Sequence, residues 1–93
     1  MSTFSVKVAQ AHIDAAVASQ AADPYVSIAA RCPVSRALSE HFGVLYTVGY
    51  DSAGPVGQTT LTLGVKARRI TGMSSDDWAK VKPCTITVTE VPQ

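Results

Sequence analysis

Large apolar side chains are scarce in this sequence of 93 residues. Leu, Ile, Phe, Met and Trp together contribute 13 residues, whereas Ala contributes 13 and Val 12. Small side chains bury little area each, so we expect one modest hydrophobic core in a single domain that spans residues 1–93. This size excludes a deep cleft between two lobes. The apolar runs are far shorter than the roughly 18 residues of a membrane-spanning helix, so no membrane is expected as a partner.

Cysteine and charge are also sparse. Only Cys32 and Cys84 are present, and the N-terminal segment shows no basic stretch followed by an apolar one. We therefore expect reduced cytosolic thiols rather than a disulfide. Eight basic and seven acidic residues give a net charge of +1, which provides no general attraction to nucleic acid. The placement of the charges matters more than their sum.

The spacing of the apolar residues predicts seven elements of secondary structure. Pro33 at the first helical position and Gly43 as a left-handed cap delimit the clearest helix. Ser74 is the expected N-cap of a short helix. Residues 25–32 fit either a helix or a short strand, and residues 51–57 indicate an exposed Gly/Pro loop. In chain order we expect a strand at 3–9, helices at 11–22 and 33–42, strands at 44–50 and 58–70, a short helix at 75–82 and a strand at 84–91.

This order predicts an α+β fold, with a small antiparallel sheet of about four strands, two main helices packed on one face and a short third helix. The outer face of the sheet is expected to be rich in threonine. In the strand at 58–70, the alternation places Leu61, Leu63, Val65 and Ala67 on the buried face and Thr60, Thr62, Lys66 and Arg68 on the outer face. Thr85, Thr87 and Thr89 extend the outer face.

Cys32 stands where a reactive thiol is sometimes found. It precedes a helix, next to Arg31 and one turn from Arg36, and both features favour a thiolate. Nucleophilic catalysis also requires a base, and His41 on the same helix lies roughly 13 Å away by helical rise. A buried thiol that caps the helix is therefore the favoured interpretation.

Other catalytic or metal-binding patterns find little support. His12, Cys32, His41 and Cys84 include no closely spaced ligand pair, which structural zinc sites nearly always have. The glycines of the segment 49–57 match neither known phosphate-binding pattern and indicate a hairpin tip. The paired Asp76 and Asp77 are explained by helix capping. We expect no catalytic residue, no metal and no cofactor.

Basic residues gather in two places. Lys66, Arg68 and Arg69 crowd the end of the strand expected at 58–70, and Arg31 and Arg36 flank the start of the helix at 33–42. One interpretation is a solvated edge that discourages strand pairing. The other is a contact surface for phosphate or for an acidic protein surface. The sequence leaves both interpretations open.

The N-terminal half carries a recognisable pattern. His12-Ile13, followed by Cys32-Pro33-Val34 and Ala37-Leu38, resembles a pattern of small phage-encoded proteins that reads HI, then CPVxxAL, then strands. This resemblance covers roughly the first 45 residues. The whole chain also looks like a small phage anti-CRISPR protein of the type I-F inhibitors.

The resemblance implies a stoichiometric inhibitor rather than an enzyme, active in the cytoplasm of the bacterial host. Its partners would be Cas proteins of a crRNA-guided surveillance (Cascade/Csy) complex, with the crRNA backbone as a further candidate, and target DNA binding would be blocked. No small-molecule substrate is implied. No family motif carries over contact residues, so we infer them from charge and expected exposure: Lys7, Arg31, Arg36, Lys66, Arg68 and Arg69, with Asp51 as a weaker candidate.

Two alternative functions stay open. A small phage nucleic-acid-binding regulatory protein would bind free RNA or DNA with a steep salt dependence, although the near-neutral net charge argues against it. A thiol-dependent enzyme would use Cys32 as its nucleophile.

Overall fold

The computed structural model describes residues 2–23 and 28–92, and within them it is an α+β fold, as predicted. The elements follow the chain in the order β1 (Thr3–Val8), α1 (Gln10–Ala22), the 3₁₀ helix η1 (Ile28–Ala30), α2 (Pro33–Phe42), β2 (Tyr46–Val48), β3 (Ser52–Pro55), β4 (Leu61–Leu63), α3 (Val65–Thr71), the 3₁₀ helix η2 (Ser75–Lys80) and β5 (Cys84–Glu90). The helices expected at 11–22 and 33–42 and the strands expected at 3–9 and 84–91 are confirmed.

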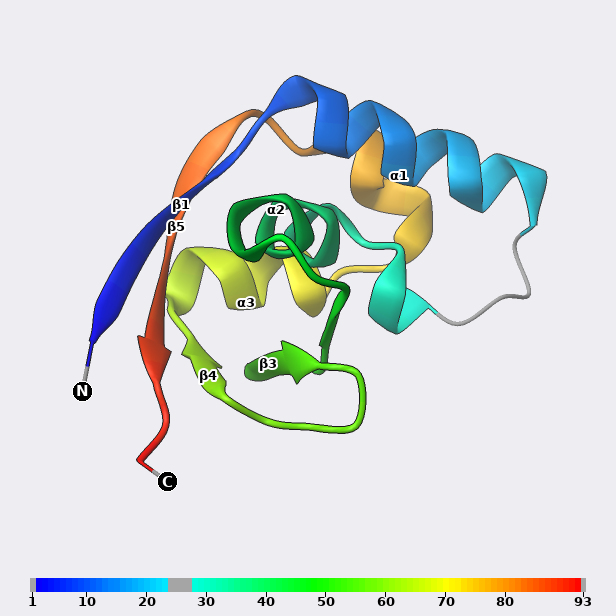
Figure 1. Cartoon of the computed structure of the whole chain (residues 1–93). Coiled ribbons are helices and arrows are strands. Elements are labelled where there is room, and N and C mark those ends of the chain that lie inside the picture. Colours follow the sequence, from blue (N-terminus) through cyan, green and yellow to red (C-terminus); the bar gives the residue numbers. More distant parts are fainter. Residues whose placement is uncertain (1, 24–27, 93) are drawn as a thin grey trace.

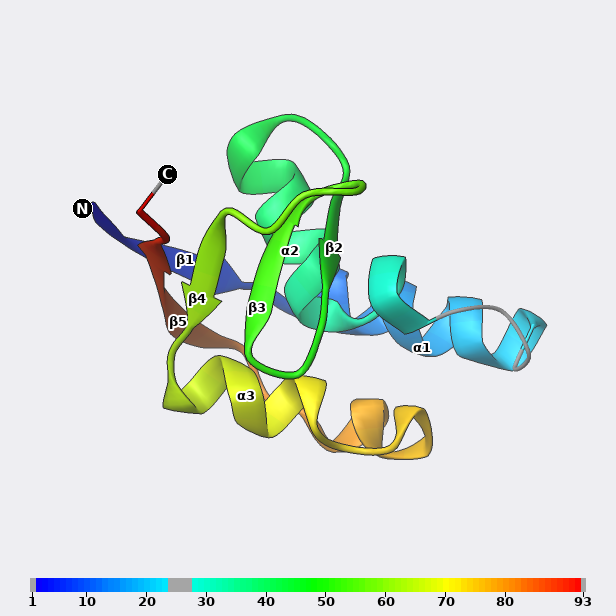
Figure 2. The same cartoon turned by 90° about the horizontal axis from the view of Figure 1, so that it is seen from below.

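The strands form one antiparallel sheet in the order β1-β5-β4-β3-β2. The sheet curls around α2, which contacts both edge strands, β1 and β2 (Figure 1). In the view from below, the short strands β3 and β2 cross in front of α2, β4 lies beside β3, and α3 lies at their lower ends (Figure 2). Val6 and Val8 of β1 and Ile86 and Val88 of β5 are buried. The core therefore lies between the concave face of the sheet and the helices.

Local sequence explains where α2 begins and ends. Cys32 is the N-cap residue, and its Sγ accepts a hydrogen bond from the Ser35 N–H at 3.4 Å. Pro33 follows at the first helical position, where its missing N–H has no role in the helix. Gly43 ends the helix at φ 76°, a left-handed conformation that favours glycine. All three predictions made for this helix are confirmed.

Two serines one turn apart attach α2 to β2. Ser35 Oγ donates a hydrogen bond to the Tyr46 carbonyl oxygen at 2.5 Å, and the Tyr46 N–H donates to Ser39 Oγ at 2.9 Å. Ser39 Oγ in turn donates to the Ser35 carbonyl oxygen at 2.8 Å. Ser35 is fully buried and cannot bond to water. These hydrogen bonds therefore supply the partners that its buried polar groups need.

Three aromatic rings lie in a row across one end of the core. The ring of Phe4 on β1 meets that of Phe42 on α2 edge-on, with 5.5 Å between centroids, and Phe42 stacks on Tyr46 of β2 at 4.8 Å. Such pairs contribute about 0.5–1.5 kcal/mol each beyond the area they bury. Since β1 and β2 are the two edges of the sheet, this row joins both edges through α2.

The prediction of a single long strand at 58–70 is wrong. Strand β4 ends at Leu63, and after Gly64 the chain turns into helix α3. The Gly64 N–H donates to the Thr87 carbonyl oxygen of β5 at 2.8 Å, so the contact with β5 continues to the residue where the helix begins.

Helical spacing decides which side chains of α3 enter the core. Ala67 and Ile70, three residues apart, are buried, whereas Val65 is 58% exposed. The alternation that placed Val65 beside Ala67 on a buried face was therefore misleading. Lys66 and Arg68 do not belong to the outer face of the sheet, where Thr62, Thr85 and Thr87 are exposed as expected.

The exposed loop expected at 51–57 is largely a strand. Residues Ser52–Pro55 form β3, which pairs with β2 on one side and β4 on the other. Ala53 and Gly54 are buried there. The sheet thus has five strands within the described residues, rather than about four, because burial between two neighbours overrides the low strand propensity of Ser-Ala-Gly-Pro.

The remaining elements differ in extent or type from the predictions. The strand expected at 44–50 is shorter, and the short helix expected at 75–82 is the 3₁₀ helix η2, whose N-cap Ser74 accepts from the Asp76 N–H at 3.4 Å. Of the ambiguous segment 25–32, residues 25–27 lie outside the described residues, and residues 28–30 form η1.

Candidate functional site

Helix α3 presents two of the predicted contact residues to solvent. Lys66 and Arg69 are exposed, while Arg68 between them is half-buried. Residues three apart on a helix are neighbours on its surface, so Lys66 and Arg69 form one positive patch. Among the described residues, neither side chain has an ion pair or hydrogen bond. Arg68 and Arg69 also lie in the last turn, where positive charge is favourable to the helix dipole.

The two arginines at the start of α2 make hydrogen bonds within the fold. Arg31 Nη1 donates to Ser19 Oγ of α1 at 2.5 Å, and Arg36 Nε donates to the Arg31 carbonyl oxygen at 3.0 Å. Both side chains are half-buried. These bonds tie the segment before α2 to the two helices, so each guanidinium has only part of its donor set left for a partner.

The other two candidates are exposed but stand apart from α3. Lys7 lies on β1 opposite Thr85, on the outer face of the sheet. Asp51 lies between β2 and β3, and its carbonyl oxygen accepts from the Leu63 N–H at 2.9 Å.

The structure divides five of the six predicted cations into two groups, and Lys7 on β1 stands apart from both. Helix α2 lies between α1 and α3 (Figure 1). Arg31 bonds to Ser19 of α1 and Arg36 bonds to the Arg31 carbonyl oxygen, whereas Lys66, Arg68 and Arg69 are on α3. They do not form one continuous surface, and α3 carries the larger group.

Sequence reasoning missed a contact between His12 and Glu40. His12 Nδ1 accepts the Ala9 N–H at 2.9 Å and so caps α1, as expected for a residue at a helix start. Accepting at Nδ1 places the proton of the neutral ring on Nε2, which faces Glu40 Oε2. Both ring nitrogens are thus engaged, which makes His12 a structural residue. No local signal links the pair, because the residues are 28 positions apart on different helices.

Cys32 does not have the properties of a nucleophile. Its side chain is 3% exposed, and burial raises the pKa of its thiol, an effect that the N–H groups at the start of α2 and the charge of Arg36 only partly offset. The thiol is therefore neutral at pH 7, and thiolate reactivity is suppressed. Cys84 is half-buried, and both cysteines are free.

Thiol labelling tests this assignment. We expect a disulfide reagent at pH 8 to react with Cys32 in the Cys84→Ala variant at least about tenfold more slowly than with Cys84 in the Cys32→Ala variant. The same variants in denaturant should react at similar rates, which controls for intrinsic reactivity. Native Cys32 that reacts as fast as the denatured thiol would restore the hypothesis of a thiol-dependent enzyme.

Within residues 2–23 and 28–92, no three His, Cys, Asp or Glu side chains are grouped to hold a metal ion. No helix among these residues combines the length and apolar character needed to cross a bilayer.

Comparisons of the chain with protein-family models, with curated proteins and with solved structures give no match.

Proposed function

We propose that this chain is a stoichiometric binding protein, an anti-CRISPR inhibitor that occupies a type I-F crRNA-guided surveillance complex and blocks its binding of target DNA. The observation that carries the proposal is the positive patch of Lys66 and Arg69, which lacks a partner among the described residues. Arg68 extends the patch at its side. Cations held on a helix without neutralising neighbours favour an anionic surface, such as acidic protein side chains or RNA phosphates.

The chemistry of the rest of the chain supports binding over catalysis. Cys32 is buried with a raised pKa, and His12 is engaged at both ring nitrogens. The resemblance of the N-terminal pattern to small phage proteins supplies the choice of partner. Cas proteins of the complex are the proposed partner, and the crRNA backbone is the second contact.

The direct test measures the affinity of a purified type I-F surveillance complex for target DNA with increasing amounts of this protein. We expect DNA binding to fall to background near one or a few equivalents. Unchanged DNA affinity at saturating protein would contradict the proposal.

Charge reversal tests the role of α3. We expect the Lys66→Glu/Arg69→Glu variant to bind the complex about a hundredfold more weakly, because two charge-assisted contacts become repulsive. The matched control is Lys80→Glu/Lys82→Glu, which changes the net charge equally at two other exposed lysines. Equal weakening in both variants would show that total charge, not the α3 patch, governs binding.

The same patch is compatible with the nucleic-acid-binding regulator, and the test separates the two. Direct binding of free RNA or DNA with a steep salt dependence, without any effect on the surveillance complex, would favour the regulator and contradict the inhibitor.

A further inference from the structure

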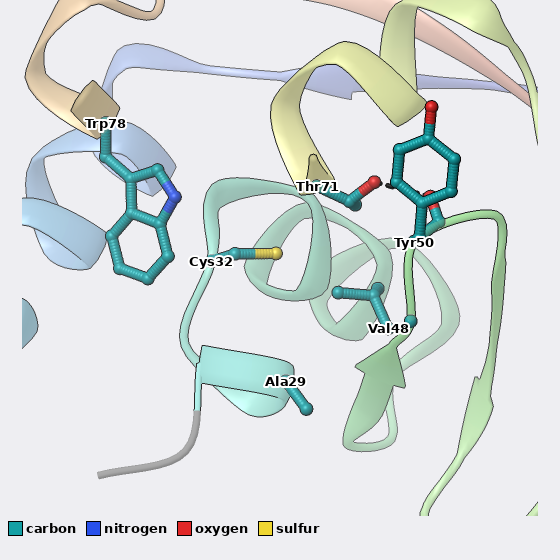
Figure 3. A pocket seen from close by; sticks show the side chains of 7 residues that line it. Ala29, Cys32, Val48, Tyr50, Thr71 and Trp78 are labelled. Atoms are coloured by element: carbon teal, nitrogen blue, oxygen red, sulfur yellow. Dashed lines mark hydrogen bonds between the residues drawn. The ribbon is translucent and has the colours of Figure 1, made fainter. Parts of the chain in front are cut away.

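A cavity of about 230 Å³ opens between η1, the start of α2, β2, α3 and η2. Figure 3 shows its walls: the Cys32 sulfur points into the space between Trp78 on one side and Val48 and Tyr50 on the other. Thr71 lies above and Ala29 below, and Gly49 also lines the cavity. The cavity is separate from the exposed face of α3 that carries Lys66 and Arg69.

One polar group in this wall lacks a partner. The Trp78 side chain is 1% exposed, and none of the described residues accepts a hydrogen bond from its indole N–H. Figure 3 shows the indole nitrogen on the edge of the ring that is turned toward Cys32 and Thr71. Among the described residues, Thr60 Oγ1 is the fully buried side-chain oxygen or nitrogen without a partner, so the indole N–H keeps some accessible surface and is available to a molecule in the cavity.

The remaining polar groups of the wall are uncharged. The Cys32 thiol is a weak donor and is neutral at pH 7. The Thr71 hydroxyl already donates to the Tyr50 carbonyl oxygen at 2.5 Å. The described residues of the lining include no charged side chain, and most of the wall is aliphatic or aromatic. Such a wall favours an uncharged ligand.

The volume limits the size of the ligand. An apolar cavity of about 150 Å³ accommodates benzene, which has six non-hydrogen atoms. A cavity of about 230 Å³ at the same packing accommodates roughly nine. A small aromatic ring with one short substituent has this size, whereas a nucleotide or a drug-sized molecule exceeds it.

We propose that this cavity is a binding site for a small, uncharged aromatic compound that carries one hydrogen-bond acceptor, such as an aryl ketone, with the acceptor on the Trp78 indole N–H. The ring of the ligand lies against Val48, Cys32 and the Tyr50 side of the cavity. This binding does not depend on the contacts of α3 with any partner.

The experiment follows a single NMR signal. Trp78 is the only tryptophan of the chain, so its indole N–H resonance needs no assignment. Titration with acetophenone to about 10 mM should move this resonance saturably, since ligands of this size bind with Kd values of about 1 mM. No saturable shift would overturn the proposal.

A matched ligand isolates the hydrogen bond. α-Methylstyrene has the same shape as acetophenone, with a CH₂ group in place of the carbonyl oxygen. We expect it to bind about tenfold more weakly, because the indole donor then stays unpaired. Equal affinities would overturn the role given to Trp78.

A blocked variant locates the site. Ala29→Leu adds bulk to the wall while leaving the reporter in place, and it should abolish the acetophenone shift in a protein whose remaining spectrum is dispersed as before. Retained binding would place the ligand elsewhere and overturn the proposal. The comparison of the two ligands on the unmodified chain stands even if this variant does not fold.

Discussion

The Trp78→Ala variant is expected to lose about 4 kcal/mol of its free energy of unfolding. Trp78 is the largest fully buried side chain, at 1% exposure, and it packs η2 into the core. Truncating a buried aromatic residue costs about 3–5 kcal/mol through lost burial and the cavity left behind. A domain of this size has roughly 5–14 kcal/mol in total, so the variant should lie close to unfolding at 37 °C.

Urea denaturation followed by circular dichroism measures this loss. The control is Tyr50→Ala, which truncates an aromatic side chain that is 64% exposed and should change the free energy of unfolding by less than about 1 kcal/mol. Similar losses in both variants would show that Trp78 is not the anchor that its burial indicates.

The Gly54→Ala variant should lose about 3 kcal/mol for a different reason. A Cβ at this position would lie 2.3 Å from the Gln58 carbonyl oxygen and 3.0 Å from the Thr60 nitrogen. Both atoms belong to the backbone of the chain that returns from β3 to β4, so relief requires this segment to move. Overpacking of this kind typically costs 1–3 kcal/mol, and backbone contacts this short place the variant at about the upper end.

Gly49→Ala is the matched control for this prediction. Its Cβ would meet the Ser52 hydroxyl at 3.5 Å and the Ser52 carbonyl oxygen at 3.8 Å, both ordinary contacts, and we expect a change within about 0.5 kcal/mol. The two variants are compared by their urea midpoints. If Gly54→Ala unfolds at the same midpoint as Gly49→Ala, the close approach of the chain to β3 is not important for stability.

The sequence predicted the elements whose signals are local. Helix α2 has an N-cap, a proline and a capping glycine within its own residues, and the alternation of β5 is strict. The segment 61–67 alternates just as strictly, yet it changes from strand to helix at Gly64. That change depends on contacts with β5 and the core, which are distant in the sequence.

The candidate site was predictable to a similar extent. The exposure of Lys66 and Arg69 follows from their charge, so it was predicted correctly although the secondary structure predicted for them was wrong. The hydrogen bond from Arg31 to Ser19 depends on how α1 packs beside α2, and no pattern in the sequence contains that information. The cavity beside Trp78 is formed by segments from five elements, and only the fold brings them together.

The pairing of β1 with β5 also has a consequence for the timing of folding. The Thr3 and Thr89 hydroxyls meet at 3.3 Å although 86 positions separate them, so the sheet closes only after the chain has been synthesised through β5. At a ribosome that adds about 5–20 residues per second, the apolar face of β1 waits for several seconds without its partner strand. Contacts this distant also slow folding in general, because a long loop must close before they form. During this time the unpaired β1 is exposed to chaperones and to aggregation.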